Sequence, residues 1–438
     1  MLLEPVPLCG RCFGAAGRSV FRCFGVSDAP AARSERNSRS ALMLSLFVYR
    51  NTERQRRTRA EGNRNTERRR RNRAAGNRNT TQMQQAHFDS TFSVLIGNRC
   101  RWAVVRRNGS ILLALPECRE AARRTLGLYQ PQRIKARAVT AMLRLAAGAG
   151  VHRWLLPALG YHHGREISDP PLPALRPSTC GFLFGSPDHR IQRVIACYET
   201  NEGWEVAKLA EGSEGIEMLN KEARFLEALA QRTDVAPRLL GLHHTLNHAI
   251  LRMPYLEGDK LKRDSGFDPL EVLESWVGAK QALDASGFPE WPAIIRGLSP
   301  CDQGAGVLGE IGGYQLTPSL HHGDFVRWNL LRRDHGQIVV LDWEWGELAG
   351  MPGLDLVHWH LQEARLVDRL EPAAALAKTA TVLRADKSRA YLERCGWIGE
   401  RGVTNAIIAS LAFKQGAGHQ QNEEILAAAV GTCGLARP

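Results

Sequence analysis

The segment His321–Leu331, HHGDFVRWNLL, places polar residues where they could act together. Asp324 lies five residues before Asn329, and Asp342 follows Asn329 by thirteen residues in the segment VVLDWEW. An amide oxygen and a carboxylate held close together suit a shared hard cation such as Mg²⁺. A second carboxylate nearby could orient a hydroxyl nucleophile while the cation neutralises charge on a transferred phosphoryl group. The spacing therefore indicates the chemistry of phosphoryl transfer.

Residues 328–343, WNLLRRDHGQIVVLDW, are typical of a β-hairpin. If His335 and Gly336 form a two-residue loop, Asn329 lies directly opposite Asp342. Directly opposed residues have Cβ atoms about 4.5–5.5 Å apart on one face of the sheet. This register predicts that the two side chains share a cation, although a four-residue loop would shift it.

The neighbours of Asp324 have supporting roles and alternative interpretations. Gly323 lets the backbone turn tightly. We include His322 among the catalytic candidates, although we expect it to pack against the loop and hydrogen-bond it rather than take part in the chemistry. A single Asp next to a strand is more often a cap or an ion-pair partner. The histidines around residues 321 and 358 could suggest a metal hydrolase, but no H-E-x-x-H spacing is present.

The hydrophobic patterns predict the elements that position these residues. Strands are expected in CGFLFG, RIQRVIACYE, WEVAKLA and NHAILRMPYLEG, with a helix in GIEMLNKEARFLEALAQ before the last of them. After residue 260 the pattern is mainly helical. We therefore predict an α+β fold with a small antiparallel-sheet lobe over residues 176–259 and a larger, mainly helical lobe over residues 260–438.

An additional unit is expected N-terminal to these lobes, over residues 83–175. RWAVVRRNGSILLALP predicts a hairpin around Asn108 and Gly109, and PQRIKARAVTAMLRLAAG predicts an amphipathic helix. The Pro-rich segment DPPLPALRP is typical of a linker. We expect this α+β unit to cover the small lobe; shaping the acceptor site and mediating assembly are the alternatives.

The charge of the chain is concentrated in its first 82 residues. The chain carries a net charge of +13, and residues 1–82, with 18 Arg, no Lys and six acidic residues, account for +12. Two 14-residue repeats, at residues 50–63 and 64–77, have no apolar seam for a coiled coil, which favours a disordered tail. The tail could bind phosphate backbones nonspecifically, or it could be a tandem duplication upstream of a start at Met83.

The residues HGDFVRWN, LDWE and GMPGLDL together resemble the aminoglycoside phosphotransferase and choline kinase-like family, whose signature is H-G-D-x-x-x-x-N, D-x-E and G-x-P-x-x-D-L. The chain is most similar to bacterial phosphotransferase-like proteins with H-G-D-F-x-P-W-N, over roughly residues 178–360. The resemblance implies a bilobal protein-kinase-like fold in which Asp324 is the catalytic base, Asn329 and Asp342 bind Mg²⁺, and Asp355 braces the loop. Arg327 stands where the pattern usually has Pro, which should reduce the rigidity of the loop and offer an anion contact.

The resemblance also requires a strand Lys for the ATP phosphates and a helix Glu that holds it. Lys208 ends the WEVAKLA strand pattern, and Glu222 follows fourteen residues later in the predicted helix. Lys221 and Glu227 are alternatives, but Lys221 lies on the helix itself.

Two further segments are expected to contact the nucleotide. The loop FGSPDHR should cover the phosphates with the backbone N–H groups of Gly185 and Ser186, although it has far fewer glycines than G-x-G-x-x-G. RMPYLEG, which contains Met253 and Tyr255, falls where the adenine-binding hinge is expected.

The leading hypothesis is an ATP-dependent phosphotransferase that acts on a hydroxyl of a small molecule, such as a sugar or an aminoglycoside-like acceptor. The alternatives are a nucleotide-binding module that has lost catalysis and a protein kinase, although neither D-F-G nor A-P-E is present. Specific nucleic-acid binding is not expected, because residues 83–438 are nearly neutral. No membrane partner is expected either, and the lack of an export signal and the scattered cysteines favour a cytoplasmic location.

Overall fold

The computed structural model describes residues 100–107, 110–131, 134–161, 177–185, 193–231, 234–245, 247–263, 265–278, 281–301, 303–418 and 423–435. The Arg-rich tail, most of the Pro-rich linker and Ser186 lie outside these ranges. Within them, no helix is long and apolar enough to span a bilayer.

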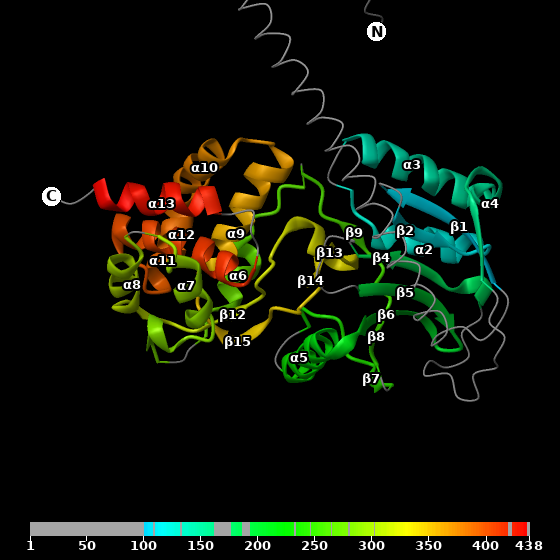
Figure 1. The fold of residues 1–438 in the computed structure, drawn as a ribbon, viewed down its shortest axis with the longest axis horizontal. Helices are drawn as coiled ribbons and strands as arrows, with labels where there is room; N and C mark the ends of the chain where they lie inside the picture. Colours follow the sequence, from blue (N-terminus) through cyan, green and yellow to red (C-terminus); the bar gives the residue numbers. More distant parts are fainter. Residues whose placement is uncertain are drawn as a thin grey trace, which may run out of the picture. The chain divides into compact units, whose positions relative to one another are not determined.

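An eight-stranded antiparallel sheet occupies the N-terminal half of the described chain (Figure 1). In spatial order its strands are β3 (Ala158–Tyr161), β1 (Cys100–Arg107), β2 (Ser110–Leu115), β4 (Gly181–Phe184), β5 (Arg193–Thr200), β6 (Gly203–Glu211), β8 (His248–Pro254) and β7 (Gly241–His244). Strand β2 pairs with β4 through Leu113 opposite Leu183. The sheet therefore continues across the boundary expected between residues 175 and 176.

Four helices accompany this sheet: α2 (Arg119–Leu128), α3 (Ile134–Ala149), α4 (His152–Leu155) and α5 (Gly212–Ala230). The predicted hairpin, amphipathic helix and strands are confirmed as β1–β2, α3, β4, β5, β6 and β8, and the predicted second helix is α5. Helix α2 was not predicted. Its sequence, REAARRTLGL, is rich in Arg and Ala, and its N-cap residue Cys118 makes no side-chain cap hydrogen bond, so the segment lacks the usual start signal.

The C-terminal half is mainly helical, as predicted. Its helices are α6 (Leu270–Trp276), α7 (Trp291–Leu298), α8 (Gly304–Gly312), α9 (Leu354–Gln362), α10 (Pro372–Arg384), α11 (Asp386–Arg394), α12 (Gly399–Gly416) and α13 (Glu423–Leu435). Its short strands are β9 (Asp259–Lys260), β10 (Leu283–Asp284), β11 (Gln315–Leu316), β12 (Ser319–His321), β13 (Leu330–Arg332), β14 (Ile338–Val340) and β15 (Glu347–Gly350). Helix α12 packs against α7 and α9.

A cluster of aromatic side chains joins α5 to the segment that carries the candidate site. The buried Trp343 ring stacks on Phe225 of α5, with centroids 5.1 Å apart, and lies 4.6 Å from the ring of His322. Trp276 of α6 contacts Trp343 from another side, at 5.4 Å. Packing of these large apolar surfaces holds the helix of the small lobe against the loop of the large lobe.

The β13–β14 hairpin has a register different from the predicted one. Leu330 pairs with Val340, and the N–H of Leu341 donates to the carbonyl of Asn329 at 2.7 Å. Asn329 is therefore opposite Leu341, and the prediction that it lies directly opposite Asp342 was wrong. The loop has three residues rather than two, because His335 and Gly336 both adopt positive φ in a 3₁₀ turn.

Candidate active site

Lys208 lies at the centre of a buried ion cluster. Its ammonium donates to Glu222 Oε1 at 2.6 Å and to Asp342 Oδ1 at 2.5 Å. The structure thus brings the Lys and Glu chosen from the sequence into contact. Burial by itself would lower the pKa of Lys208, but Asp342 and Glu222 outweigh this and raise it. The ammonium is therefore held charged inside the protein, aimed from β6 towards the end of the β13–β14 hairpin.

Asp342 reaches Lys208 because its backbone leaves the strand. It follows β14 and has φ of +69°, a left-handed conformation that is uncommon for a residue other than glycine. Burial would raise the pKa of Asp342, but Lys208 and then Arg193 outweigh it and lower the pKa. A residue at such an angle, held by charge, is typical of a functional site.

Asp355, at the start of α9, braces the loop that carries Asp324. Its two carboxylate oxygens accept the backbone N–H groups of His322 at 2.7 Å and Gly323 at 3.0 Å. His322 accepts the N–H of Asp324 on Nδ1 at 3.1 Å, and its Nε2 lies 2.9 Å from the carbonyl of Leu341. The His322 ring therefore joins the two segments of the site, which is the packing role expected for it.

Asp324 itself is held by three side chains. His358 Nε2 lies 2.9 Å from Oδ1, Asn329 Nδ2 donates to Oδ2 at 3.1 Å, and Lys414 Nζ of α12 lies 3.7 Å from Oδ1. Burial would raise the pKa of Asp324, but Lys414 and then His358 outweigh it, so the pKa is lowered. With its side chain 35% exposed, this ionised carboxylate remains open to a hydroxyl from outside.

The sequence patterns did not identify Lys414 and His358 as contacts of Asp324. Lys414 is only 5% exposed and donates to the carbonyl of Gly323. A lysine is almost never buried without a partner. The isolated Lys in the otherwise uncharged segment ASLAFKQGA was a signal that could have revealed a buried charge, but its partner could not be read from the sequence.

Asn329 and Asp342 fit a hard cation in their chemistry. The Asn329 amide nitrogen donates to the carbonyl of Asp324 at 3.0 Å and to its carboxylate, which leaves the amide oxygen as an acceptor. Asp342 is ionised and 36% exposed. No group of three or more His, Cys, Asp or Glu suited to a metal occurs among the described residues. A site for Mg²⁺ here would need oxygen ligands from water and phosphate as well.

Arg327 ties its loop to Glu363, Trp359 and Lys262. Its guanidinium donates to both carboxylate oxygens of Glu363, at 2.9 and 2.6 Å, and lies 5.4 Å from the centroid of the Trp359 ring. It also donates to the carbonyl of Lys262. The expected loss of rigidity stays a prediction, and the bidentate ion pair supplies a restraint that acts against it. The anion that Arg327 contacts is Glu363.

The segments expected to contact the nucleotide are described in part. Gly185 directly follows β4, and its N–H donates to the carbonyl of Arg193 at 2.9 Å, so this group is already hydrogen-bonded to β5. Ser186 lies outside the described residues. Met253 is buried in β8. The N–H of Tyr255 donates to Trp204 at 2.8 Å. The roles of these four residues in nucleotide binding stay predictions.

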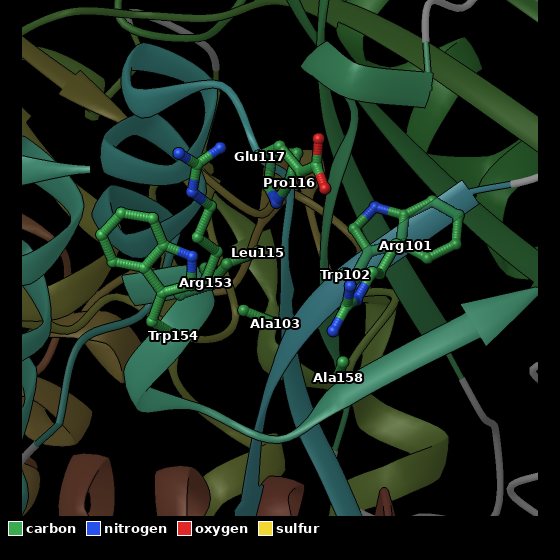
Figure 2. Close-up of a pocket in the computed structure, with 9 residues that line it drawn as sticks. All are labelled: Arg101, Trp102, Ala103, Leu115, Pro116, Glu117, Arg153, Trp154 and Ala158. Atoms are coloured by element: carbon green, nitrogen blue, oxygen red, sulfur yellow. The ribbon is translucent and has the colours of Figure 1, made fainter. Parts of the chain in front are cut away.

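Two cavities lie in the described part of the chain, and neither is lined by Lys208, Asp324 or Asp342. One, of about 260 Å³, adjoins the loop at Arg327 and is also lined by Trp359, Glu363, Asp368 and Lys378. The other, of about 210 Å³, lies in the N-terminal unit and contains none of the predicted site residues. Figure 2 shows Arg153 and Trp154 of α4 on one side of it and Arg101 and Trp102 of β1 on the other.

Comparisons with known proteins give matches among solved structures only; no family model and no curated protein matches the chain. The fructosamine-3-kinase of Haemophilus somnus 129PT is 15% identical with a TM-score of 0.35, over 56% of this chain and 88% of that one. Choline kinase of Cryptosporidium parvum Iowa II is 12% identical with a TM-score of 0.34, over 59% and 89%.

A third match is the aminoglycoside phosphotransferase APH(3'')-Id of Streptomyces rimosus ATCC10970, in complex with ADP and streptomycin. It is 16% identical with a TM-score of 0.27, over 48% of this chain and 90% of that one. At these identities and TM-scores the matches record only a partial likeness of fold. The described residues form a mixed α+β fold with an antiparallel sheet and a helical C-terminal half.

Proposed function

We propose that this protein is an ATP-dependent phosphotransferase that transfers the γ-phosphoryl group to a hydroxyl of a small molecule. The observation that carries the proposal is the presence of two groups of charged residues in the candidate site. Lys208 is held between Glu222 and Asp342, while a separate, accessible carboxylate, Asp324, is ionised beside Asn329. Phosphoryl transfer needs both parts, because one holds the phosphates and the other orients the nucleophile.

Each residue has a distinct part in the proposed reaction. Lys208 binds the α and β phosphates, and Glu222 keeps its ammonium in place. Asp324 accepts a hydrogen bond from the acceptor hydroxyl and aims its oxygen at the γ-phosphorus. Asn329 and Asp342 would hold Mg²⁺, which would neutralise charge on the phosphates. Because Lys208 and Asp342 are in contact at 2.5 Å, we expect their side chains to separate when a nucleotide binds between them.

The acceptor is expected to be polar. We place the acceptor in the cavity at Arg327, three residues from Asp324. Its charged lining residues Arg263, Glu363, Asp368 and Lys378 favour a hydroxylated compound over an apolar one. A sugar, an amino alcohol or an aminoglycoside-like molecule meets this description. We further propose that the protein works in the cytoplasm, without a specific nucleic-acid or membrane partner.

ATP consumption by the purified protein, measured with Mg²⁺ against a panel of sugars, amino alcohols and aminoglycosides, tests the proposal. At least one acceptor should raise the rate, and the product should carry one additional phosphate by mass spectrometry. Asp342→Ala should abolish the Mg²⁺-dependent rise in melting temperature caused by ATP. Binding of Mg-ATP with no transfer to any acceptor would favour a nucleotide-binding module, and failure to bind any nucleotide would contradict both functions.

A further inference from the structure

Helix α2 of the N-terminal unit lies on the same face of the sheet as Lys208. Leu113 is opposite Leu183, Leu183 is opposite Ile195, and Ile195 is opposite Lys208. Directly opposed residues of antiparallel strands project to the same side. Leu113 and Leu183 pack with Ala122 and Leu126 of α2, so the helix covers the face from which Lys208 projects.

The helix sits tightly on that face because glycines make room for it. Gly181 of β4 is opposite Cys197, two residues from Ile195, and a Cβ atom at Gly181 would collide with the side chain of Thr125 of α2. A Cβ at Gly127 would lie 2.9 Å from the hydroxyl of Tyr255. Helix α2 therefore packs closely on the strand that leads to the expected phosphate loop and on the residue that follows β8.

Arg124 connects α2 to the expected hinge. Its guanidinium lies 4.9 Å from the centroid of the Trp204 ring and 5.0 Å from that of Tyr255. The same group pairs with Glu257 at 2.5 Å and with Glu120 of its own helix at 3.0 Å. Its side chain is 16% exposed, although the Glu257 side chain is 73% exposed. A partly desolvated guanidinium between two aromatic rings restrains both of them.

We propose that α2 is part of the nucleotide site: it forms the wall of the nucleobase pocket at the hinge, and Arg124 is the positioning residue that fixes Tyr255 there. This inference rests on the proposed function, since it takes the hinge as the place of the nucleobase. It goes further because it assigns the N-terminal unit a direct part in nucleotide selection. We expect a purine base to be large enough to contact α2, whereas a smaller pyrimidine base should make less contact with it.

Calorimetric titration of the full chain with Mg-ADP and Mg-CDP tests the proposal, because the two ligands carry the same phosphates. The parent should prefer Mg-ADP. Arg124→Ala should weaken Mg-ADP binding about tenfold, as expected for loss of a desolvated cation–π contact, while Mg-CDP binding changes by less than about threefold. Arg124→Lys keeps a charge for Glu257 and should recover part of the affinity.

Arg123→Ala is the matched control, because Arg123 is the preceding residue of the same helix. Its side chain is 59% exposed, and among the contacts described it pairs only with Glu120. It should bind both ligands as the parent does. Melting temperatures without nucleotide should be similar for all variants, which separates positioning from loss of fold.

Several outcomes would overturn the inference. If the parent binds Mg-ADP but Arg124→Ala binds it equally well, Arg124 has no positioning role, although the proposed function survives. Tighter binding by the variant would mean that α2 obstructs the pocket. An equal loss for both nucleotides, or an equal affinity of the parent for both, would show that the wall does not touch the base. If the parent binds neither, the proposed function fails too.

Discussion

At the scale of single residues, the site depends on how Asp324 is held. Asn329 and His358 contact different oxygens of its carboxylate, and Lys414 supplies a positive charge from α12. These contacts fix the orientation of the carboxylate and keep it ionised. A carboxylate with a low pKa is a weak base, so its contribution is to orient the hydroxyl. This suits a reaction in which the protein mainly positions groups and stabilises charge.

Asp324→Asn should keep affinity for Mg-ATP while it removes most of the turnover. The amide cannot carry the negative charge that orients the acceptor hydroxyl, whereas the Lys208 cluster is unchanged. Loss of the correct orientation can cost about 10²-fold in rate. Calorimetry with Mg-ATP and the transfer rate with the identified acceptor are the measurements. A rate within about threefold of the parent would contradict the role of Asp324.

Lys414→Met should slow transfer by at least about tenfold, because it removes the nearest cation from the Asp324 carboxylate. Mg-ATP affinity should stay unchanged, since Lys414 contacts Asp324 and the Gly323 carbonyl rather than the Lys208 cluster. Met has a similar length and is apolar, so the buried position remains filled. The transfer rates and the melting temperatures of the parent and the variant would be compared. A fall in melting temperature that accounts for the lost activity would show a purely structural role.

At the scale of elements, the loop is braced by helices that come later in the chain. Asp355 of α9 holds its backbone, and Glu363, directly after α9, holds Arg327. On the other side, His321 Nδ1 lies 2.5 Å from Glu290, and Glu290 also accepts the N–H of Met351 at 3.1 Å. Elements that precede and follow the loop in the chain therefore hold it in place. A substitution in either should change the position of Asp324.

Arg327→Ala should lower the free energy of unfolding by about 2 kcal/mol, a typical value for charge-assisted hydrogen bonds. The variant loses both bonds to Glu363 and the contact with Trp359. Turnover should fall further than nucleotide affinity, because Arg327 lies in the loop of Asp324. Urea unfolding measures the change, with Arg333→Ala, at an exposed residue of the neighbouring hairpin, as control. Equal stabilities of the two variants would show that the ion pair contributes little.

The pair of His321 and Glu290 should make stability depend on pH. Burial would lower the pKa of His321, but Asp355 and Glu290 outweigh this and raise it in the folded protein. A raised folded pKa means that the stabilisation is fully present below the unfolded value, about 6.5, and is lost as pH rises through the folded pKa.

Unfolding of the parent and of Glu290→Gln should therefore be compared from pH 6 upward. Near pH 6 the variant should have a lower free energy of unfolding than the parent, and the difference between the two free energies should shrink as pH rises. A difference that stays constant over this range would show that His321 is not charged against Glu290.

At the scale of the molecule, the N-terminal unit shares one sheet with the small lobe. Strand β2 covers the edge of β4, and α2 covers the Lys208 face. Without residues 100–161, the backbone groups of β4 and the apolar Leu183 would be exposed at an open edge. Such an edge invites aggregation.

A chain starting at Met83 should fold and bind Mg-ATP as the full chain does, because the first 82 residues have little apolar surface and carry +12 of the +13 charges. Salt-dependent binding to DNA, if present in the full chain, should disappear with them. A chain starting at Ser178 should instead aggregate or lose nucleotide affinity. Thermal melting, light scattering and calorimetry distinguish these results. A well-folded shorter chain with parent affinity would contradict the role of the N-terminal unit.

The sequence by itself determined the local elements and the identity of the candidate residues. Periodicity located β4, β5, β6, β8 and α5, because strand and helix patterns are local properties of the chain. The spacing of polar residues around Asp324 indicated phosphoryl chemistry. The family resemblance, together with the order of Lys208 and Glu222 along the chain, selected a pair that meets in space.

Only the tertiary structure decided how these parts meet. The register of the β13–β14 hairpin depends on the positive φ of His335, and a shift of one residue reverses the faces of a strand. The contact of Lys414 with Asp324 spans 90 residues of sequence, and that of Arg124 with Glu257 spans 133. Such contacts arise from the packing of helices on one another and on a sheet. Neither composition nor spacing specifies them, because they depend on which apolar faces are buried together.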